Sequence, residues 1–337
     1  CIIIMSIDLS IDPGRLLYGL SRIGYTTSSA LCDIIDNSIR AEAENIHILI
    51  KKEREDLADS RKNNVKEYLI IDDGVGMDSD GIQEALTLGA SDQLYEDHSL
   101  SKFGLGLKSA SFSQGDLLEV ISSDGESHFT KYRVSLPLVM EAQKYFAEVV
   151  DISEEDQMLI DTYLNGKGTI IRITDIRKNN HPSVKNTLSE LKTKIGVIYY
   201  YFLSETDLNI FLGDRQIESL DPLFTDEANE HGNLNEFEWD GTMVQWIEKP
   251  FQLTLDDDLK IEVTIEITQL PYPPIFKIKN LGESKDSEIR DKYLIGSGNY
   301  GFYVYRNKRY RTGCLCKGEL INVEDIFLTV ALLEFYE

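Results

Sequence analysis

The side chains that build disulfide frameworks and zinc centres are scarce in this sequence. The chain of 337 residues has only four cysteines, and they form no set of regularly spaced pairs. Cys314 and Cys316 lack a second ligand pair, and the five histidines include no HxxH or HxxxH pair. The sequence therefore argues against a disulfide scaffold and against a metal centre built from histidine or cysteine.

Basic residues are few in comparison with acidic ones. Lys and Arg number 34 against 58 Asp and Glu, which gives a formal net charge of −24 at pH 7. Because Lys and Arg are the residues that bind phosphate backbones, this balance argues against a broad nucleic-acid surface and leaves room only for a local basic patch.

Long apolar runs are also missing. Hydrophobic residues make up 42% of the chain, which suffices for globular cores but is too little for membrane spans. The apolar residues 1–5 are too short for a signal peptide or an anchor. We therefore expect a cytoplasmic protein with no membrane partner. A chain of 337 residues exceeds the size at which one core usually stays single, so we expect two domains.

The sequence does contain glycine turns that adjoin charged residues. The apolar run Leu69 to Ile71 leads into Asp72-Asp73-Gly74-Val75-Gly76-Met77, so a buried strand delivers a carboxylate and then turns on two glycines. A carboxylate in this position can accept a hydrogen bond from the exocyclic amine of a base.

A second glycine turn occurs at residues 103–110, and it combines Gly104 and Gly106 with Lys108 before a helix-compatible segment. Backbone N–H groups at a glycine-rich helix start can hold phosphates. Taken alone, each of the two turns is more often ordinary loop structure than part of a nucleotide site.

Residues 27–42 predict a helix whose polar residues fall within one narrow arc: Asp33, Asp36, Asn37 and Arg40. For the helix alone, a solvated face is the simpler interpretation. However, Asp33 and Asn37 lie one helical turn apart, so an amide oxygen could take Mg²⁺ while a carboxylate polarises a water.

A fourth segment, Gly166 to Ile173, is a small-residue turn that leads into an alternating strand. With these four pieces in order, residues 16–175 resemble the GHKL ATPases. DNSIRA resembles the family's N-box, IDDGVGM its adenine-aspartate motif, SKFGLGLKSASF its lid motif and GKGT its closing Gly-Thr strand. The residues of these motifs are most similar to those of MORC proteins and their bacterial MORC-like and MutL-like relatives, which share the FGxGLKS lid.

The resemblance implies an α+β protein in two domains. Residues 1–180 would form a Bergerat-type α/β sandwich that binds ATP, with a lid at about 86–108. Residues 181–337 would form a ribosomal-protein-like α+β transducer domain, incomplete at its C-terminal end. We place the boundary at the polar stretch 177–182, which ends in proline.

The resemblance also implies a role for each motif residue. Asp72 would bind the adenine amine, Thr169 would support Asp72 through a water or hydroxyl contact, Asn37 would hold Mg²⁺ and Asp33 would activate water. The base pocket would include Ala41, Gly74, Gly76 and Met77, and the phosphates would be covered by Lys102, Phe103, Gly104, Leu105, Gly106, Leu107 and Lys108.

Two departures from the family pattern stand out. Asp33 occupies the position of the family's catalytic Glu, and it is shorter by one C–C bond of about 1.5 Å. Since a displacement of about 1 Å can cost roughly 10²-fold in rate, we expect slow hydrolysis. The transducer lysine that reaches the γ-phosphate in related ATPases has no clear counterpart, because Lys308 and Lys317 fall in an expected turn and loop.

The functional hypothesis is Mg-dependent ATP binding and slow hydrolysis. By the resemblance, ATP would drive lid closure and homodimerisation of a clamp that acts in DNA processing or anti-phage defence, with DNA or a DNA-processing protein as partner. Residues 6–26 would either reach a second subunit or brace their own domain. One alternative is a non-hydrolysing, ATP-dependent interaction module. The other is a histidine kinase, which needs a phosphoacceptor histidine before the N-box, where the sequence has none.

Overall fold

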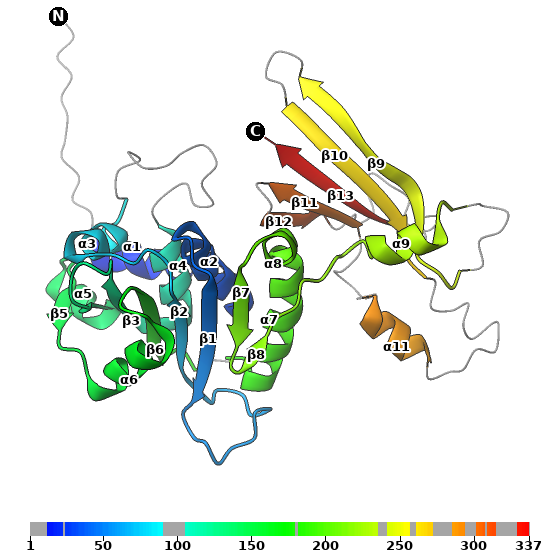
Figure 1. Ribbon diagram of the computed structural model, residues 1–337. Helices are drawn as coiled ribbons and strands as arrows, with labels where there is room; N and C mark the ends of the chain where they lie inside the picture. The colour runs from blue at the N-terminus through cyan, green and yellow to red at the C-terminus, as the bar shows by residue number, and fades with distance from the viewer. Residues whose placement is uncertain are drawn as a thin grey trace, which may run out of the picture. The chain divides into compact units, whose positions relative to one another are not determined.

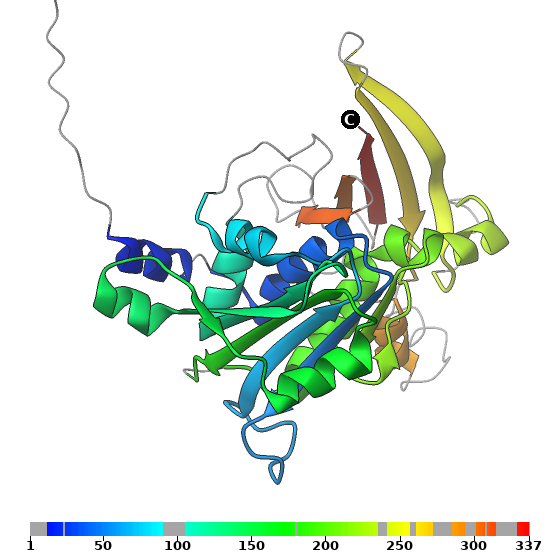
Figure 2. The same ribbon diagram turned by 60° about the vertical axis from the view of Figure 1, so that its left-hand side comes forward.

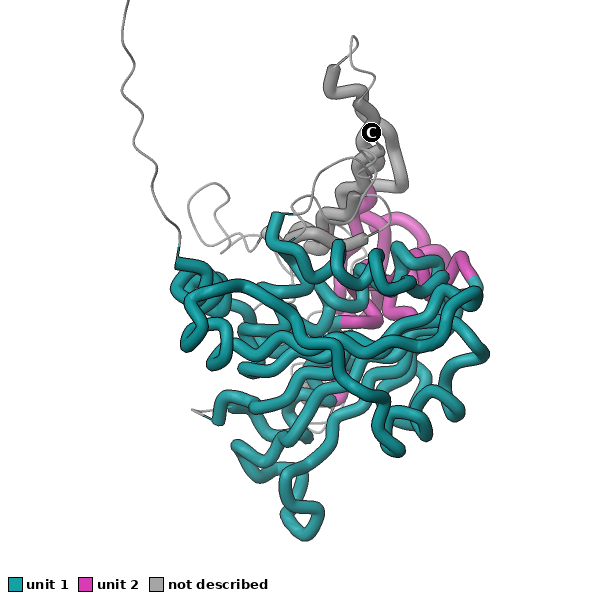
Figure 3. The backbone as a smooth tube through the Cα atoms, turned by 90° about the vertical axis from the view of Figure 1, so that its left-hand side faces the viewer, with its two compact units in different colours: residues 1–194, 207–217 teal, residues 195–206, 218–337 magenta. Residues whose placement is uncertain are grey.

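The structure is a computed structural model of the chain. It describes residues 12–22, 24–89, 105–178, 181–234, 241–256, 261–271, 285–293, 301–306, 309–314 and 329–336. Two compact units are present (Figure 3): unit 1 comprises residues 1–194 and 207–217, and unit 2 comprises residues 195–206 and 218–337. The dividing line falls within helix α7 (Val184–Ile198), downstream of the stretch 177–182. The assignment of an ATP-binding domain to 1–180 and a transducer domain to 181–337 stays a prediction.

Unit 1 is built on an eight-stranded mixed sheet with the strand order β5-β4-β3-β6-β2-β1-β7-β8 (Figure 1). The pairing is antiparallel except between β1 and β7, which run parallel. The strands are β1 (Asn45–Lys52), β2 (Val65–Asp72), β3 (Gly115–Ser123), β4 (Thr130–Ser135), β5 (Glu148–Val150), β6 (Gly168–Ile176), β7 (Asn209–Leu212) and β8 (Arg215–Gln216). The order β3-β6-β2 matters most for the site, because it brings together segments that are far apart in the sequence.

Helices cover both faces of this sheet (Figure 2). Alternate residues of β2 point to opposite faces: Asp72 meets Ser38 of α2, whereas Leu69 and Ile71 pack against Leu159 of α6. The helices of unit 1 are α1 (Pro13–Leu20), α2 (Thr27–Arg40), α3 (Ser79–Leu86), α4 (Gly106–Gln114), α5 (Leu136–Ala142), α6 (Glu154–Tyr163) and most of α7. Burial on both faces explains why β2 reads as a continuous apolar run.

Helix α2 matches the predicted helix 27–42 closely. The Thr26 side chain caps its start by accepting from the N–H of Ser29. The polar arc of α2 is not a uniformly solvated face, since the Asp36 side chain is buried while Asp33 and Asn37 are partly exposed. Helices α2 and α4 pack against each other and against strands β2, β3 and β6 of the sheet.

Apolar residues recur at helical spacing over residues 183–203 and predict one long helix. The prediction is wrong in one respect, because the structure has two helices there, α7 and α8 (Tyr200–Glu205). The break falls at Tyr199, whose backbone (φ −107°, ψ 24°) leaves the helical region. This part of the sequence is a run of β-branched and aromatic residues, which have only modest helix propensity. The chain could therefore bend there at little cost.

Unit 2 contains a five-stranded sheet with the order β12-β11-β13-β10-β9. Its further elements are α9 (Thr225–His231), β9 (Gln245–Asp256), β10 (Ile261–Gln269), α11 (Lys285–Lys292), β11 (Gly301–Arg306), β12 (Arg309–Cys314) and β13 (Thr329–Tyr336). The sequence predicts a hairpin of residues 301–306 and 309–311 about Asn307 and Lys308, and the antiparallel pairing of β11 with β12 confirms it. The turn residues Asn307 and Lys308, like Lys317, lie outside the described residues.

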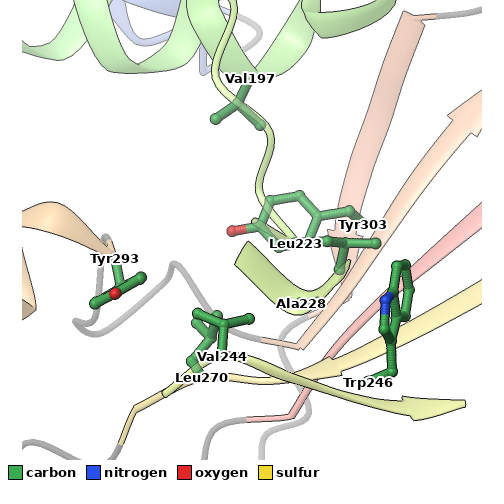
Figure 4. Packing of buried hydrophobic residues seen from close by; sticks show 8 residues of the cluster. All are labelled: Val197, Leu223, Ala228, Val244, Trp246, Leu270, Tyr293 and Tyr303. Carbon is green, nitrogen blue, oxygen red and sulfur yellow. The ribbon is translucent and has the colours of Figure 1, made fainter. Parts of the chain in front are cut away.

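A hydrophobic cluster organises the described part of unit 2 (Figure 4). Trp246 of β9 and Leu270, directly after β10, are 3% and 1% exposed, so they form part of its core. The other buried members are Val197, Leu223, Ala228, Val244, Tyr293 and Tyr303. The cluster joins segments widely separated in the sequence, so unit 2 has a core of its own.

Candidate functional site

The carboxylate predicted to read a base lies at the end of β2 and is buried. The Asp72 side chain is only 4% exposed. Its Oδ2 accepts a hydrogen bond from the Ser38 hydroxyl at 2.7 Å, and its Oδ1 accepts one from the N–H of Gly74 at 3.2 Å. An ionised carboxylate offers about four acceptor positions, so these two contacts leave acceptor capacity unused.

Burial changes the acidity of this group. Removal from water raises the pKa of Asp72 from 3.8 to about 6, with a smaller upward contribution from the nearby charge of Asp73. The hydrogen bonds from Ser38 and Gly74 oppose that rise, because they stabilise the anion. At neutral pH Asp72 is therefore mostly an anion and can only accept hydrogen bonds.

The adjacent Asp73 has a different task. Its Oδ1 accepts from the backbone N–H groups of Glu44 and Asn45, at 2.9 and 2.8 Å, and its Oδ2 accepts from the Asn45 side-chain amide at 2.7 Å. These three bonds fix the turn after β2 to the start of β1. Of the two consecutive carboxylates, only Asp72 keeps unused acceptor capacity in a buried setting.

The glycines of the turn are required by close backbone packing. A Cβ on Gly74 would lie 2.5 Å from the carbonyl oxygen of Ala41. Gly76 has φ +67°, and a Cβ there would lie 1.8 Å from the carbonyl oxygen of Ser123. The N–H of Val75 also donates to Ala41 O at 2.8 Å. The turn is thus seated between the C-terminal end of α2 and the end of β3.

Thr169 and Met77, both predicted for the pocket, are brought together by Ser122 of β3. Thr169 is the register partner of Asp72 in the β2–β6 pair. The Ser122 Oγ lies 2.8 Å from Thr169 Oγ1, donates to the carbonyl of Gly168 at 2.8 Å, and accepts from the N–H of Met77 at 2.9 Å. No local pattern in the sequence pointed to Ser122, whereas Ser38 lies inside the DNSIRA motif and could have been found.

Asp33 and Asn37, which are one turn apart on α2, lie next to each other as the helix period predicts. Asp33 Oδ2 accepts a hydrogen bond from the Tyr25 hydroxyl at 2.5 Å, and Asn37 Nδ2 donates to the carbonyl of Asp33 at 3.3 Å. Both side chains of the pair are partly exposed. Tyr25 precedes the helix cap and was not predicted, because the hydrogen bond depends on how the chain enters α2.

Helix α4 begins at Gly106 without a side-chain cap, because its N-cap residue is Leu105. Leucine is a poor residue at this position, since it offers no acceptor to the first N–H groups. Gly106, Leu107 and Lys108 form the first turn, whereas Lys102, Phe103 and Gly104 lie outside the described residues.

The Lys108 side chain does not extend into solvent. It is 2% exposed, and its Nζ donates to the carbonyls of Ala85 and Thr87 at 2.8 and 2.9 Å. Burial lowers its pKa from 10.5 to about 8. In this structure Lys108 therefore ties the first turn of α4 to the C-terminal end of α3.

Two further observations concern metal ions and membranes. Among the residues that the structure describes, no cluster of three His, Cys, Asp or Glu side chains could hold a metal ion by itself. Within the same part of the chain, no helix is long and apolar enough to cross a membrane.

Comparison with protein families gives a match over part of the chain. A search of curated protein sequences finds none. Residues 25–166 match the family described as "Histidine kinase-, DNA gyrase B-, and HSP90-like ATPase". This range includes Asp33, Asn37, Asp72 and Ser122, and it begins at Tyr25. The match is to the broad family and does not single out MORC proteins. Residues 25–166 are therefore a GHKL-like ATPase domain.

Proposed function

We propose that this domain binds Mg-ATP through Asp72 and hydrolyses it slowly with Asp33 as general base. The observation that carries the proposal is the state of Asp72. It is an almost fully buried carboxylate whose contacts are a hydroxyl and a backbone N–H, and no ion pair with Lys or Arg involves it among the described residues. A buried charge held without a counter-ion is costly, so a ligand that donates to it offers a reason for its presence.

The adenine ring would be recognised through its exocyclic amine, which supplies a hydrogen-bond donor for the Asp72 carboxylate. Asp72 would accept one N–H, with Thr169 beside it on the neighbouring strand. The close approach of Gly74 and Gly76 to the backbone of Ala41 and Ser123 supports a rigid pocket, because neither glycine can be replaced without moving a strand or a helix end.

For the phosphates, the first turn of α4 is the matching feature. Its N–H groups have no side-chain acceptor from the cap, and the positive end of the helix dipole favours an anion there. Lys108 would contribute by fixing this turn to α3 through its two carbonyl contacts. A direct phosphate contact by Lys108, as the resemblance implies, requires those contacts to break.

The residues on α2 fit a magnesium ion bound together with phosphates. Asn37 donates through Nδ2 to the backbone carbonyl of Asp33, so this hydrogen bond does not use its Oδ1. Mg²⁺ keeps several waters and takes few protein ligands beside phosphate oxygens, which agrees with the lack of a multi-ligand cluster in the described chain. When bound, the ion would neutralise charge that develops on the phosphates.

Hydrolysis would depend on the pair Asp33 and Tyr25. The tyrosine hydroxyl donates to Oδ2 of Asp33, so this contact would orient the carboxylate that takes a proton from water. An aspartate one bond shorter than glutamate makes this step slow or blocks it. That departure favours the second candidate, an ATP-dependent interaction module that does not turn over.

The decisive experiment measures ATP binding and turnover separately. Asp33→Asn should leave the Kd for Mg-ATP nearly unchanged and lower turnover by roughly 10²–10⁴-fold, because it deletes the basic lone pair. Asn37→Ala should weaken Mg-ATP binding itself. Asp36→Asn is the comparison variant on the same helix; because Asp36 is buried, its unfolding curve must be recorded too. If Asp36→Asn stopped turnover and Asp33→Asn did not, the base assignment would be wrong.

A wild-type protein that binds Mg-ATP with no measurable turnover would leave the interaction module as the function. Nucleotide-dependent homodimerisation stays a prediction, and light scattering with and without a non-hydrolysable ATP analogue tests it. An unchanged mass at saturating nucleotide would rule out the clamp for this chain. The DNA-processing and anti-phage roles implied by the resemblance to MORC proteins also stay predictions.

A further inference from the structure

Ser122 is a fully buried serine whose hydrogen-bonding capacity is completely used. A serine hydroxyl has one proton to donate and two lone pairs that accept. Its proton goes to the carbonyl of Gly168, which can only accept, and one lone pair takes the N–H of Met77. Only the second lone pair remains for the 2.8 Å contact with Thr169.

The direction of the last contact follows by elimination. Because Ser122 has no second proton, the Thr169 hydroxyl must be the donor in that contact. Its proton is then used inside the protein. The Thr169 oxygen can offer only lone pairs to anything else that approaches it.

Thr169 and Asp72 are register partners on adjacent strands, so their side chains stand on the same face of the sheet. Asp72 accepts from Ser38 and Gly74 and is an acceptor at neutral pH. The two side chains therefore present acceptors, and no donor, at the end of β2 and the start of β6.

We propose that Ser122 is a specificity-determining residue, acting through Thr169. By holding the Thr169 proton, Ser122 makes this wall of the pocket all-acceptor, which selects a purine with an amine at position six and rejects one with an oxo group there. The inference rests on the proposed ATP site. Ser122 touches no ligand itself, so it is a positioning residue.

Inosine triphosphate is the suitable probe, since it replaces the amine by an oxygen. In Ser122→Ala the Thr169 hydroxyl loses its acceptor and becomes free to turn and donate to an oxo group. The preference, defined as the Kd for ITP divided by the Kd for ATP, should fall by about tenfold without reversing, because Asp72 still faces the oxygen.

Ser123→Ala is the matched control. Ser123 is the next residue of the same strand, is equally buried at 0% exposure, and donates to the carbonyl of Ser127 at 2.7 Å. Its loss should disturb stability as much as the loss of Ser122 but leave the ITP-to-ATP preference unchanged. Equal weakening of both nucleotides in Ser122→Ala would overturn the inference and reduce Ser122 to a structural role.

Thr169→Val keeps the inference testable even if Ser122→Ala does not fold. If Thr169 offers only an acceptor, its removal should weaken ATP but not ITP, whereas loss of a donor would weaken ITP as well. The double variant of Ser122→Ala and Thr169→Val should show the same ITP-to-ATP preference as Thr169→Val alone. Without the Thr169 hydroxyl, the side chain at position 122 has no proton to hold. Wild-type protein that binds neither nucleotide would refute the proposed function itself, a result distinct from an unchanged preference.

Discussion

The two faces of the eight-stranded sheet bury polar groups in opposite ways. On the α6 side, buried acids and bases form ion pairs with each other: Lys131 lies 3.0 Å from Glu119 and 2.9 Å from Asp156, and Arg172 lies 2.8 Å from Asp156. On the α2 side, Asp72 is buried with a hydroxyl and a backbone N–H as its partners. Within the described residues, one face holds charges that are paired with each other, and the other holds Asp72 without a counter-ion.

The acidities of the two aspartates show the consequence. Burial opposes the ionisation of Asp156, but hydrogen bonds from Lys131 and Ser153 and the charge of Arg172 outweigh it and lower its pKa. For Asp72 burial prevails, and the pKa rises to about 6. Burial of an ion without a counter-ion is expensive, which is why Asp72 supports the proposed site. The paired cluster, by contrast, explains how α6 is held on the sheet.

The largest effect should come from breaking the paired cluster. Asp156→Ala leaves Lys131 and Arg172 with one acid fewer and removes the capping box at the start of α6. We expect the free energy of unfolding to fall by about 3–5 kcal/mol, measured by urea denaturation. Glu155→Ala is the control: its side chain is 48% exposed, so the cost should stay below about 1 kcal/mol. Similar costs would show that the buried cluster has no special weight.

The same kind of change on the other face should have the opposite sign. Asp72→Asn removes a charge that burial disfavours, so the protein without nucleotide should become more stable at pH 7. A rise in pKa from 3.8 to about 6 sets an upper limit of about 3 kcal/mol. ATP affinity should fall by roughly tenfold to a hundredfold, because the amide presents a donor to the adenine amine. Calorimetry with wild-type affinity would remove Asp72 from the site.

The pH dependence sharpens this contrast. Since the folded-state pKa of Asp72 is about 6, above the 3.8 of the unfolded chain, the folded protein binds more protons between these values. Its contribution to stability is thus lost as pH rises from about 4 through 6. The stability gap between Asp72→Asn and wild type should open over this window and be absent near pH 4. ATP affinity of the wild type should change the other way, falling as pH drops below about 6.

The smallest effect concerns the orientation of Asp33. Tyr25→Phe removes the hydrogen bond to Oδ2, and we expect turnover to fall by about tenfold with an unchanged Kd for ATP. Tyr68→Phe is the control, because the Tyr68 hydroxyl bonds to His181 at 2.7 Å within a buried cluster. That variant should lose stability and keep its turnover. A loss of ATP affinity in Tyr25→Phe would indicate a role in binding.

The elements closest to the site could be predicted from the sequence because their signals are local. The apolar run of β2 followed by Asp72, the period of α2 and the strand β6 all appeared near their observed bounds. By contrast, α6 was missed, although Ser153 and Asp156 form its capping box. Aspartate in place of the usual Glu or Gln weakens that pattern.

Local patterns in the amino-acid sequence were enough to locate the candidate site segments: a carboxylate at a strand end, a polar pair one helical turn apart, and glycines at turns. Three contacts could be found only in the folded chain: Ser122 with Thr169, Tyr25 with Asp33, and Lys108 with the end of α3. Helix period and turn chemistry are properties of neighbouring residues, whereas these contacts depend on the strand order β3-β6-β2 and on the packing of helices.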